Sequence, residues 1–222
     1  MNRLSLDPAE PGGDDADFFN WLDDDPVPRR KGERTRKELV ATCARLLAAE
    51  PFDRLTVSEL CKSAGVAHGT FYVYFDNLNA ISAEVLGLFV DYVQLEMRAA
   101  ARWPGDASRN TTAAYMRLFE QHAGLMKCLV TGVDAFPEAS AAFQRLNNDW
   151  ARTVVRALRR SETDTHRSEE DLMRRAYALG GMVDQYLTAL HVTGDPWIRT
   201  LSQDREVVLD LFTQLWEQGM QP

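Results

Sequence analysis

The 222-residue sequence has few cysteines, no long apolar run and no alternating strand pattern. Its three cysteines, Cys43, Cys61 and Cys128, match no CxxC or zinc-binding spacing, so we expect free, buried thiols in a reducing cytoplasm. No run approaches the roughly 18 apolar residues that a membrane span needs, and the acidic N-terminus lacks the apolar segment of a signal peptide. The sequence therefore predicts a cytoplasmic protein with no membrane partner.

Signatures of catalysis are also missing. The histidines lie far apart in the sequence, at His68, His122, His166 and His191. We find no glycine loop for phosphate, no cluster with metal-ligand spacing and no nucleophile elbow. We therefore predict that the protein is not an enzyme and carries neither a metal nor a cofactor.

Charge is distributed unevenly along the chain. The net charge is −8, yet residues 29–75 hold nine basic and five acidic residues. Residues 1–28 hold eight acidic residues and one basic residue, and residues 76–222 hold twenty acidic and fifteen basic residues. A basic segment in an acidic chain is typical of a surface that binds phosphates.

Apolar residues recur at helical spacing from about Glu33 onward, which predicts an all-α fold. The expected helices cover 33–49, a short helix that opens at 56, 68–74, 78–101, 108–131, 137–143, 144–160, 168–192 and 203–218. Thr56 and Ser168 are each followed three residues later by an acidic residue, which predicts two capping boxes.

Residues 1–28 are rich in Asp, Pro and Gly, which indicates disorder. An apolar cluster at 18–22 interrupts the acidic residues. This extension is either an inert leader or a segment that docks on a protein, and it could compete with DNA for the basic surface.

Residues 56–75 carry the strongest functional signal. Two short helices joined at Gly65 have the spacing of a helix-turn-helix, and glycine suits the positive φ that such a turn needs. The second helix would enter the major groove with its first residues on base edges, while hydroxyls and basic side chains bind phosphates. The residues that we expect to contact DNA are Arg34, Arg36, Thr56, Ala67, His68, Gly69, Thr70, Tyr72 and Tyr74.

This segment resembles the DNA-binding domain of the TetR family of regulators, from Arg34 to about Leu86. The matching positions are Thr56, Val57, Ala64, Gly65, Val66, Gly69, Thr70, Phe71, Tyr72, Tyr74, Phe75 and Ile81. Two positions depart from the family pattern: Ala67 replaces a serine and Leu78 replaces a lysine. Composition predicts a disordered acidic extension at 1–30, and the resemblance implies an N-terminal three-helix DNA-binding domain at 31–91 and a C-terminal helical effector-binding and dimerisation domain at 92–222.

The resemblance further implies a repressor that binds a palindromic operator in double-stranded DNA as a homodimer and is released by a small-molecule effector. The alternative is a helical ligand-binding or scaffold module that no longer binds DNA, which Ala67 and Leu78 would favour. Candidate effector contacts, for each of which plain core packing is the favoured alternative, are Met116, Phe119, His122, Met126, Phe143, Asn147, Trp150, Tyr177 and Asp184. Candidate dimer contacts are Met182, Tyr186, Val208, Leu211, Phe212 and Leu215.

Overall fold

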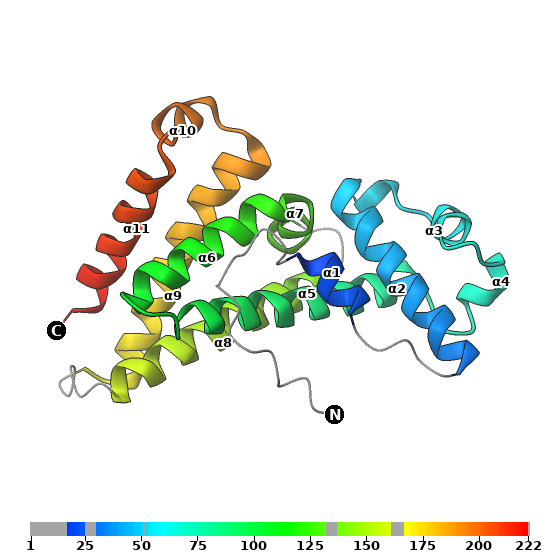
Figure 1. Cartoon of the computed structure of the whole chain (residues 1–222), viewed down its shortest axis with the longest axis horizontal. Helices are drawn as coiled ribbons and strands as arrows, with labels where there is room; N and C mark the ends of the chain where they lie inside the picture. The colour runs from blue at the N-terminus through cyan, green and yellow to red at the C-terminus, as the bar shows by residue number, and fades with distance from the viewer. Residues whose placement is uncertain (1–16, 25–29, 51, 132–136, 161–166, 222) are drawn as a thin grey trace. The chain divides into compact units, whose positions relative to one another are not determined.

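The computed structural model describes residues 17–24, 30–50, 52–131, 137–160 and 167–221, and these residues form helices and no strands (Figure 1). The all-α prediction is therefore confirmed. The chain divides into two compact units. The described residues of the N-terminal unit lie within 17–92 and 121–143, and those of the C-terminal unit lie within 93–120 and 144–221.

The N-terminal unit is built on α2 (Lys31–Ala49), which packs against α3 (Val57–Ser63) and α7 (Ala123–Thr131). It also contains α1 (Phe18–Asp23), η1 (Phe52–Arg54), α4 (His68–Phe71), the first part of α5 (Leu78–Ala100) and the start of α8 (Pro137–Arg160). A β-carbon at Gly124 would lie 2.0 Å from the carbonyl oxygen of Ala48, so only glycine allows α7 to approach α2 this closely.

The helix α1 differs from the disorder predicted for residues 1–28. Phe18 is fully buried, and its ring lies 5.1 Å from that of Phe89 and 5.6 Å from that of Tyr92. Asp17 caps the helix by accepting from the Phe19 amide at 3.3 Å. Burial of these rings offsets the entropy lost on ordering, an effect that average composition does not register. Residues 1–16 and 25–29 lie outside the described residues.

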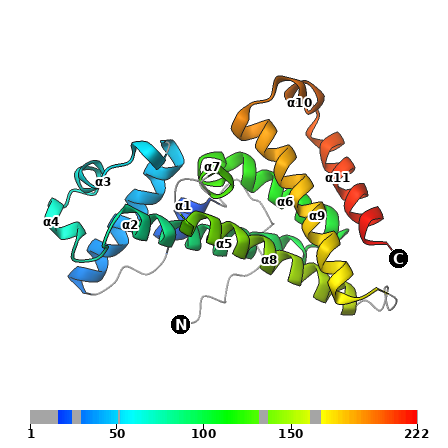
Figure 2. The ribbon, with the colours of Figure 1, turned by 180° about the vertical axis from the view of Figure 1, so that it is seen from behind.

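The C-terminal unit combines the end of α5 with α6 (Ala107–Gln121), most of α8, α9 (Glu169–Leu187), the π-helical turn η3 (Thr188–Thr193), α10 (Pro196–Leu201) and α11 (Arg205–Met220). Figure 2 shows α9 and α11 side by side. Leu172 and Ala176 of α9 share a buried apolar cluster with Val155 of α8 and Met220 of α11.

Several helix boundaries differ from the prediction. The expected helix at 108–131 is interrupted at His122, and the two helices expected at 137–143 and 144–160 are one. The helix expected at 168–192 ends in the π-helical turn, and α10 was not predicted. The N-cap hydrogen bond of each predicted capping box is confirmed: the Thr56 hydroxyl accepts from the Glu59 amide, and the Ser168 hydroxyl from the Asp171 amide, each at 3.1 Å.

Among the described helices, α5 alone has the length and composition that would allow it to cross a membrane. A core helix of a soluble protein passes the same test, and half of the most apolar window of α5 is buried. Ile81, Val85, Phe89 and Val93 are all fully buried, and their spacing places them on one face. The helix therefore has the burial pattern of a core helix.

Candidate DNA interface and effector cavity

The turn between α3 and α4 has the geometry that the sequence predicts. Gly65 has φ +65°, in the left-handed region. The Val66 amide donates to the Cys61 carbonyl oxygen at 3.0 Å, which satisfies one of the free carbonyls at the end of α3. Ala67 is the N-cap of α4 and provides no side-chain hydrogen bond.

The start of α4 presents an exposed face. Ala67, His68 and Gly69 are exposed, and nothing lies within 4 Å of a β-carbon built on Gly69. On the opposite side Phe71 is fully buried. The buried ring anchors α4 and leaves three predicted base-contacting residues together at the surface.

The aromatic residues after α4 differ in exposure. Tyr72 is 54% exposed and Val73 is 73% exposed. Tyr74 is half-buried, and its hydroxyl lies 3.2 Å from the β-carbon position of Gly32. Tyr72 is therefore accessible to a phosphate, whereas Tyr74 packs against the start of α2.

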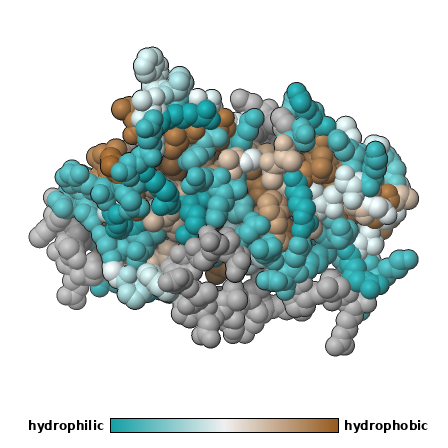
Figure 3. Space-filling model, turned by 45° about the horizontal axis from the view of Figure 1, so that its top comes forward, coloured by the Kyte–Doolittle hydropathy of each residue, from teal (hydrophilic) through white to brown (hydrophobic). Residues whose placement is uncertain are grey.

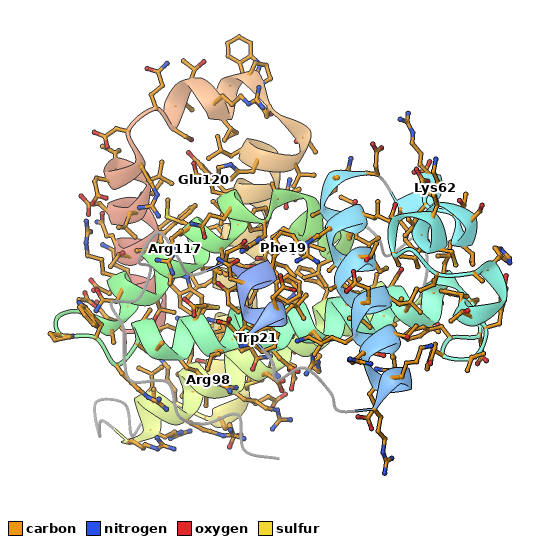
Figure 4. All side chains as sticks on the ribbon, turned by 45° about the vertical axis from the view of Figure 1, so that its right-hand side comes forward. Phe19, Trp21, Lys62, Arg98, Arg117 and Glu120 are labelled. Atoms are coloured by element: carbon orange, nitrogen blue, oxygen red, sulfur yellow. The ribbon has the colours of Figure 1, made fainter. Side chains whose placement is uncertain are left out.

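The basic side chains of α2 differ in the contacts that they make within the N-terminal unit. Arg36 Nη1 donates to Glu84 Oε1 at 2.7 Å, Nη2 donates to Oε2, and the guanidinium carbon lies 5.0 Å from the centre of the Phe75 ring. Arg36 thus forms a bidentate ion pair inside its unit, and its predicted contact with a DNA phosphate stays a prediction. Arg34 is exposed, and Figure 4 shows Lys62 pointing away from α3.

The C-terminal unit encloses a cavity of about 500 Å³ between α5, α6, α8, α9 and α11. Three of the predicted effector contacts line it: Asn147, Trp150 and Asp184. Sequence reasoning missed most of its apolar lining, including Met97, Leu146, Val183 and Trp216. Helical periodicity in the sequence does not distinguish residues that line a cavity from residues that pack in a core.

A buried hydrogen bond joins two walls of this cavity. The Tyr115 hydroxyl of α6 donates to Asp184 Oδ1 of α9 at 2.6 Å. Burial raises the pKa of the Asp184 carboxyl from 3.8 to about 6, although the Tyr115 hydrogen bond acts in the opposite direction. Burial and the neighbouring carboxylate likewise raise the pKa of Tyr115.

A second carboxylate lines the cavity near the chain's end. Glu217 of α11 is exposed, and a hydrogen bond with the Asp106 side chain raises its pKa, as do desolvation and repulsion from that carboxylate. The cavity therefore has one buried and one exposed carboxylate in its wall.

The other predicted effector contacts lie away from this cavity. Met116, Phe119, His122 and Met126 are buried in the cores of their units, and Phe143 is half-buried in the N-terminal unit. Tyr177 is 43% exposed, and its hydroxyl accepts from Asn148 at 2.9 Å. These residues share the helical spacing of the cavity residues but lie on other faces.

His122 is the clearest of these departures. It sits among the rings of Phe18, Phe89 and Tyr92, and its Nε2 lies 3.6 Å from Asp17 Oδ1. Burial lowers the pKa of His122, while Asp17 opposes that shift. The side chain is thus part of the aromatic core beneath α1.

The predicted dimer contacts also separate by burial. Val208 and Phe212 are buried in their own unit, where the Tyr186 ring lies 5.1 Å from that of Phe212. Met182, Tyr186 and Leu215 are half-buried. Leu211 is 43% exposed, and Trp197 and Leu201 of α10 and Val207 of α11 are exposed as well. Figure 3 shows apolar side chains gathered around α10 and α11.

Within the described residues, no group of three His, Cys, Asp or Glu side chains is placed to hold a metal. The three cysteines are free and buried, as predicted. Burial raises the pKa of Cys43 to about 12, despite a hydrogen bond with Ser82, and that of Cys128 to about 11.

Comparison with known proteins agrees with the geometry of the N-terminal unit. The model of the family described as "Bacterial regulatory proteins, tetR family" matches residues 39–85. The HTH-type transcriptional regulator EthR of Mycobacterium tuberculosis is 30% identical over 81 residues, which are 36% of this chain and 38% of EthR. EthR of Mycolicibacterium smegmatis is 24% identical over 126 residues, 55% of this chain and 58% of that protein. The chain thus spans about two fifths of the length of the first of these relatives.

The fold extends further than the sequence similarity. A transcriptional regulator from Rhodococcus sp. Rha1 superposes with a TM-score of 0.64 at 21% identity, covering 83% of this chain and 96% of that one. At this identity the similarity establishes a shared fold and nothing about the ligand.

Proposed function

We propose that the chain is a sequence-specific DNA-binding transcriptional regulator of the TetR family and acts in the cytoplasm, because residues 39–85 match the model of that family. The observation that carries the proposal is the exposed start of α4, where Ala67, His68 and Gly69 project beyond a turn set by Gly65. His68 and Thr70 supply hydrogen-bonding groups for base edges, and Tyr72 and Arg34 supply phosphate contacts.

The regulator acts as a homodimer on a near-palindromic operator. Two recognition helices then enter successive major grooves about 34–36 Å apart. The exposed apolar side chains of α10 and α11 support this assembly, since large apolar groups at a surface favour burial against a partner.

An effector in the C-terminal cavity releases the operator. The cavity volume of about 500 Å³ lies within the usual range for small-molecule sites, roughly 300–1,000 Å³. An effector that prefers one conformer by about 1–3 kcal/mol changes operator affinity roughly 5–150-fold. In the repressor case this release restores promoter access, and no step requires catalysis by the protein.

The first test is selection of operator sequences from a random DNA pool, followed by measurement of affinity for the selected sequence against salt concentration. A regulator enriches a palindrome and binds it with steep salt dependence. A folded protein that enriches no sequence, with or without candidate effectors, would instead be a ligand-binding or scaffold module, the alternative to which Ala67 and Leu78 point.

A further inference from the structure

We propose that the cavity of the C-terminal unit selects amphipathic cations, small molecules with an apolar body and one cationic group that Asp184 holds at the wall. This inference rests on the proposed function in taking that cavity as the effector site.

The wall provides an apolar body-binding surface. Met97, Leu146 and Val183 contribute aliphatic or thioether groups, and Trp150 and Trp216 contribute indole rings. Apolar area removed from water in such a site drives binding of any amphipathic molecule. The apolar wall therefore favours a ligand with an apolar body. The charged side chains of the wall then determine which head group of that ligand binds most tightly.

The charges of the wall have one sign. Among the described residues, the titratable side chains that line the cavity are Tyr115 of α6, Asp184 of α9 and Glu217 of α11, and none of these lining residues is Lys, Arg or His. The residues that α5 and α8 contribute to the lining are uncharged. A carboxylate ligand would meet two carboxylates in a site of low dielectric, whereas a cation would be attracted by both.

Asp184 is the group that a cation would satisfy. Among the described residues its hydrogen-bond partner is Tyr115, which binds Oδ1, and no basic side chain forms an ion pair with it. A buried carboxylate without a cation is destabilised, which agrees with its raised pKa of about 6. A ligand cation would supply the missing charge, and the two indole rings add surfaces that favour cations.

The site therefore predicts a pH dependence of binding. A permanent cation binds more tightly as pH rises through about 6, because Asp184 then becomes a carboxylate. Tyr115 stays protonated over this range since its pKa is raised well above 10. Glu217, whose pKa is raised beside Asp106, contributes in the same direction from the exposed part of the wall.

The test titrates the full-length protein without DNA, by calorimetry, with three probes that share one alkyl chain: dodecyltrimethylammonium, dodecanol and dodecanoate. We expect the cation to bind at least roughly tenfold more tightly than either of the others, and to gain affinity as pH rises through about 6. Asp184→Asn should remove this preference and its pH dependence. Glu170→Gln, the same carboxylate-to-amide change at an exposed position of α9, should retain both.

Each other outcome overturns a distinct claim. Equal or tighter binding of dodecanol or dodecanoate to the wild type overturns the inference, and so does the absence of binding by all three. Should Asp184→Asn fail to fold by circular dichroism, a wild-type affinity for the cation that does not change with pH overturns it alone. Cation binding that leaves operator affinity unchanged would preserve the inference and contradict the proposed release mechanism.

Discussion

The basic side chains of α2 differ in the contacts that they make within the N-terminal unit, although the sequence gives no reason to distinguish them. Arg34 and Arg36 are both exposed, but Arg36 is paired with both carboxylate oxygens of Glu84. The bidentate ion pair with Glu84 joins α2 to α5, so Arg36 contributes to the stability of the N-terminal unit in the absence of DNA.

We therefore predict that Arg34→Ala lowers the salt slope of operator binding by about 0.9, the value for one phosphate contact. Arg36→Ala should instead lower the free energy of unfolding by about 0.5–1 kcal/mol, since it removes a partly exposed bidentate ion pair with Glu84. Affinity against salt and urea denaturation measure the two effects. Equal changes in salt slope for both variants would contradict this division.

The turn residue Gly65 allows a matched comparison of glycines. Its φ of +65° penalises any β-carbon, so Gly65→Ala should destabilise the protein by about 1–2 kcal/mol. Gly181 lies within α9 with nothing within 4 Å of its β-carbon position, so Gly181→Ala should stabilise the monomer by up to about 1 kcal/mol. Urea denaturation of both variants checks the opposite signs, and the same sign for both would refute the role of the turn.

The buried carboxyl of Asp184 predicts how stability depends on pH. Its folded-state pKa is raised, so its contribution is fully present below 3.8 and is lost as pH rises through about 6. The stability of Asp184→Asn relative to the wild type should therefore increase by about 2–3 kcal/mol across this interval. Urea denaturation at a series of pH values measures that difference, and a constant difference would contradict the raised pKa.

At the scale of helices, the sequence predicts those features that are determined by residues close to one another in the chain. The caps at Thr56 and Ser168 and the turn at Gly65 depend on neighbouring residues, and all three form as expected. The interruption at His122 depends on distant residues, because its ring packs under α1 and Gly124 must approach Ala48. Periodicity cannot detect that requirement, since apolar spacing continues on both sides.

The contribution of α1 to stability, which the composition of residues 1–28 did not predict, can be tested by substitution. Phe18→Ala should destabilise the N-terminal unit by about 3–5 kcal/mol, because it empties a fully buried site between Phe89 and Tyr92. Asn20→Ala, at an exposed position of the same helix, should change stability by no more than about 0.5 kcal/mol. Similar denaturation midpoints for both variants would show that α1 adds no stability.

At the scale of the whole molecule, the sequence predicted part of the candidate site. The helix-turn-helix could be recognised because its residues are contiguous, so their spacing fixes their geometry. The cavity draws on five helices distant in sequence, and Asn147, Trp150 and Asp184 were separable from core only by polarity or size. Tertiary packing decides which face of a helix meets a cavity, which explains why Phe119 and Met126 are core residues.

The proposed homodimer predicts which face of α11 meets the partner. Val208 and Phe212 already pack inside their own unit, so the exposed side chains Val207 and Leu211 remain for a second copy. A carboxylate at the centre of an apolar interface would be buried without a partner, at a cost of roughly 3 kcal/mol or more.

Leu211→Glu should therefore raise the dimer dissociation constant about a hundredfold or more, measured by analytical ultracentrifugation over a range of concentrations. Because Leu211 is 43% exposed in the single chain, the monomer should remain folded by circular dichroism. Ala141→Glu introduces the same side chain at an exposed position of α8 and should leave the dissociation constant unchanged. If Leu211→Glu sediments as the wild-type dimer does, the partner binds elsewhere, and the half-site spacing of the operator must then be derived from another face.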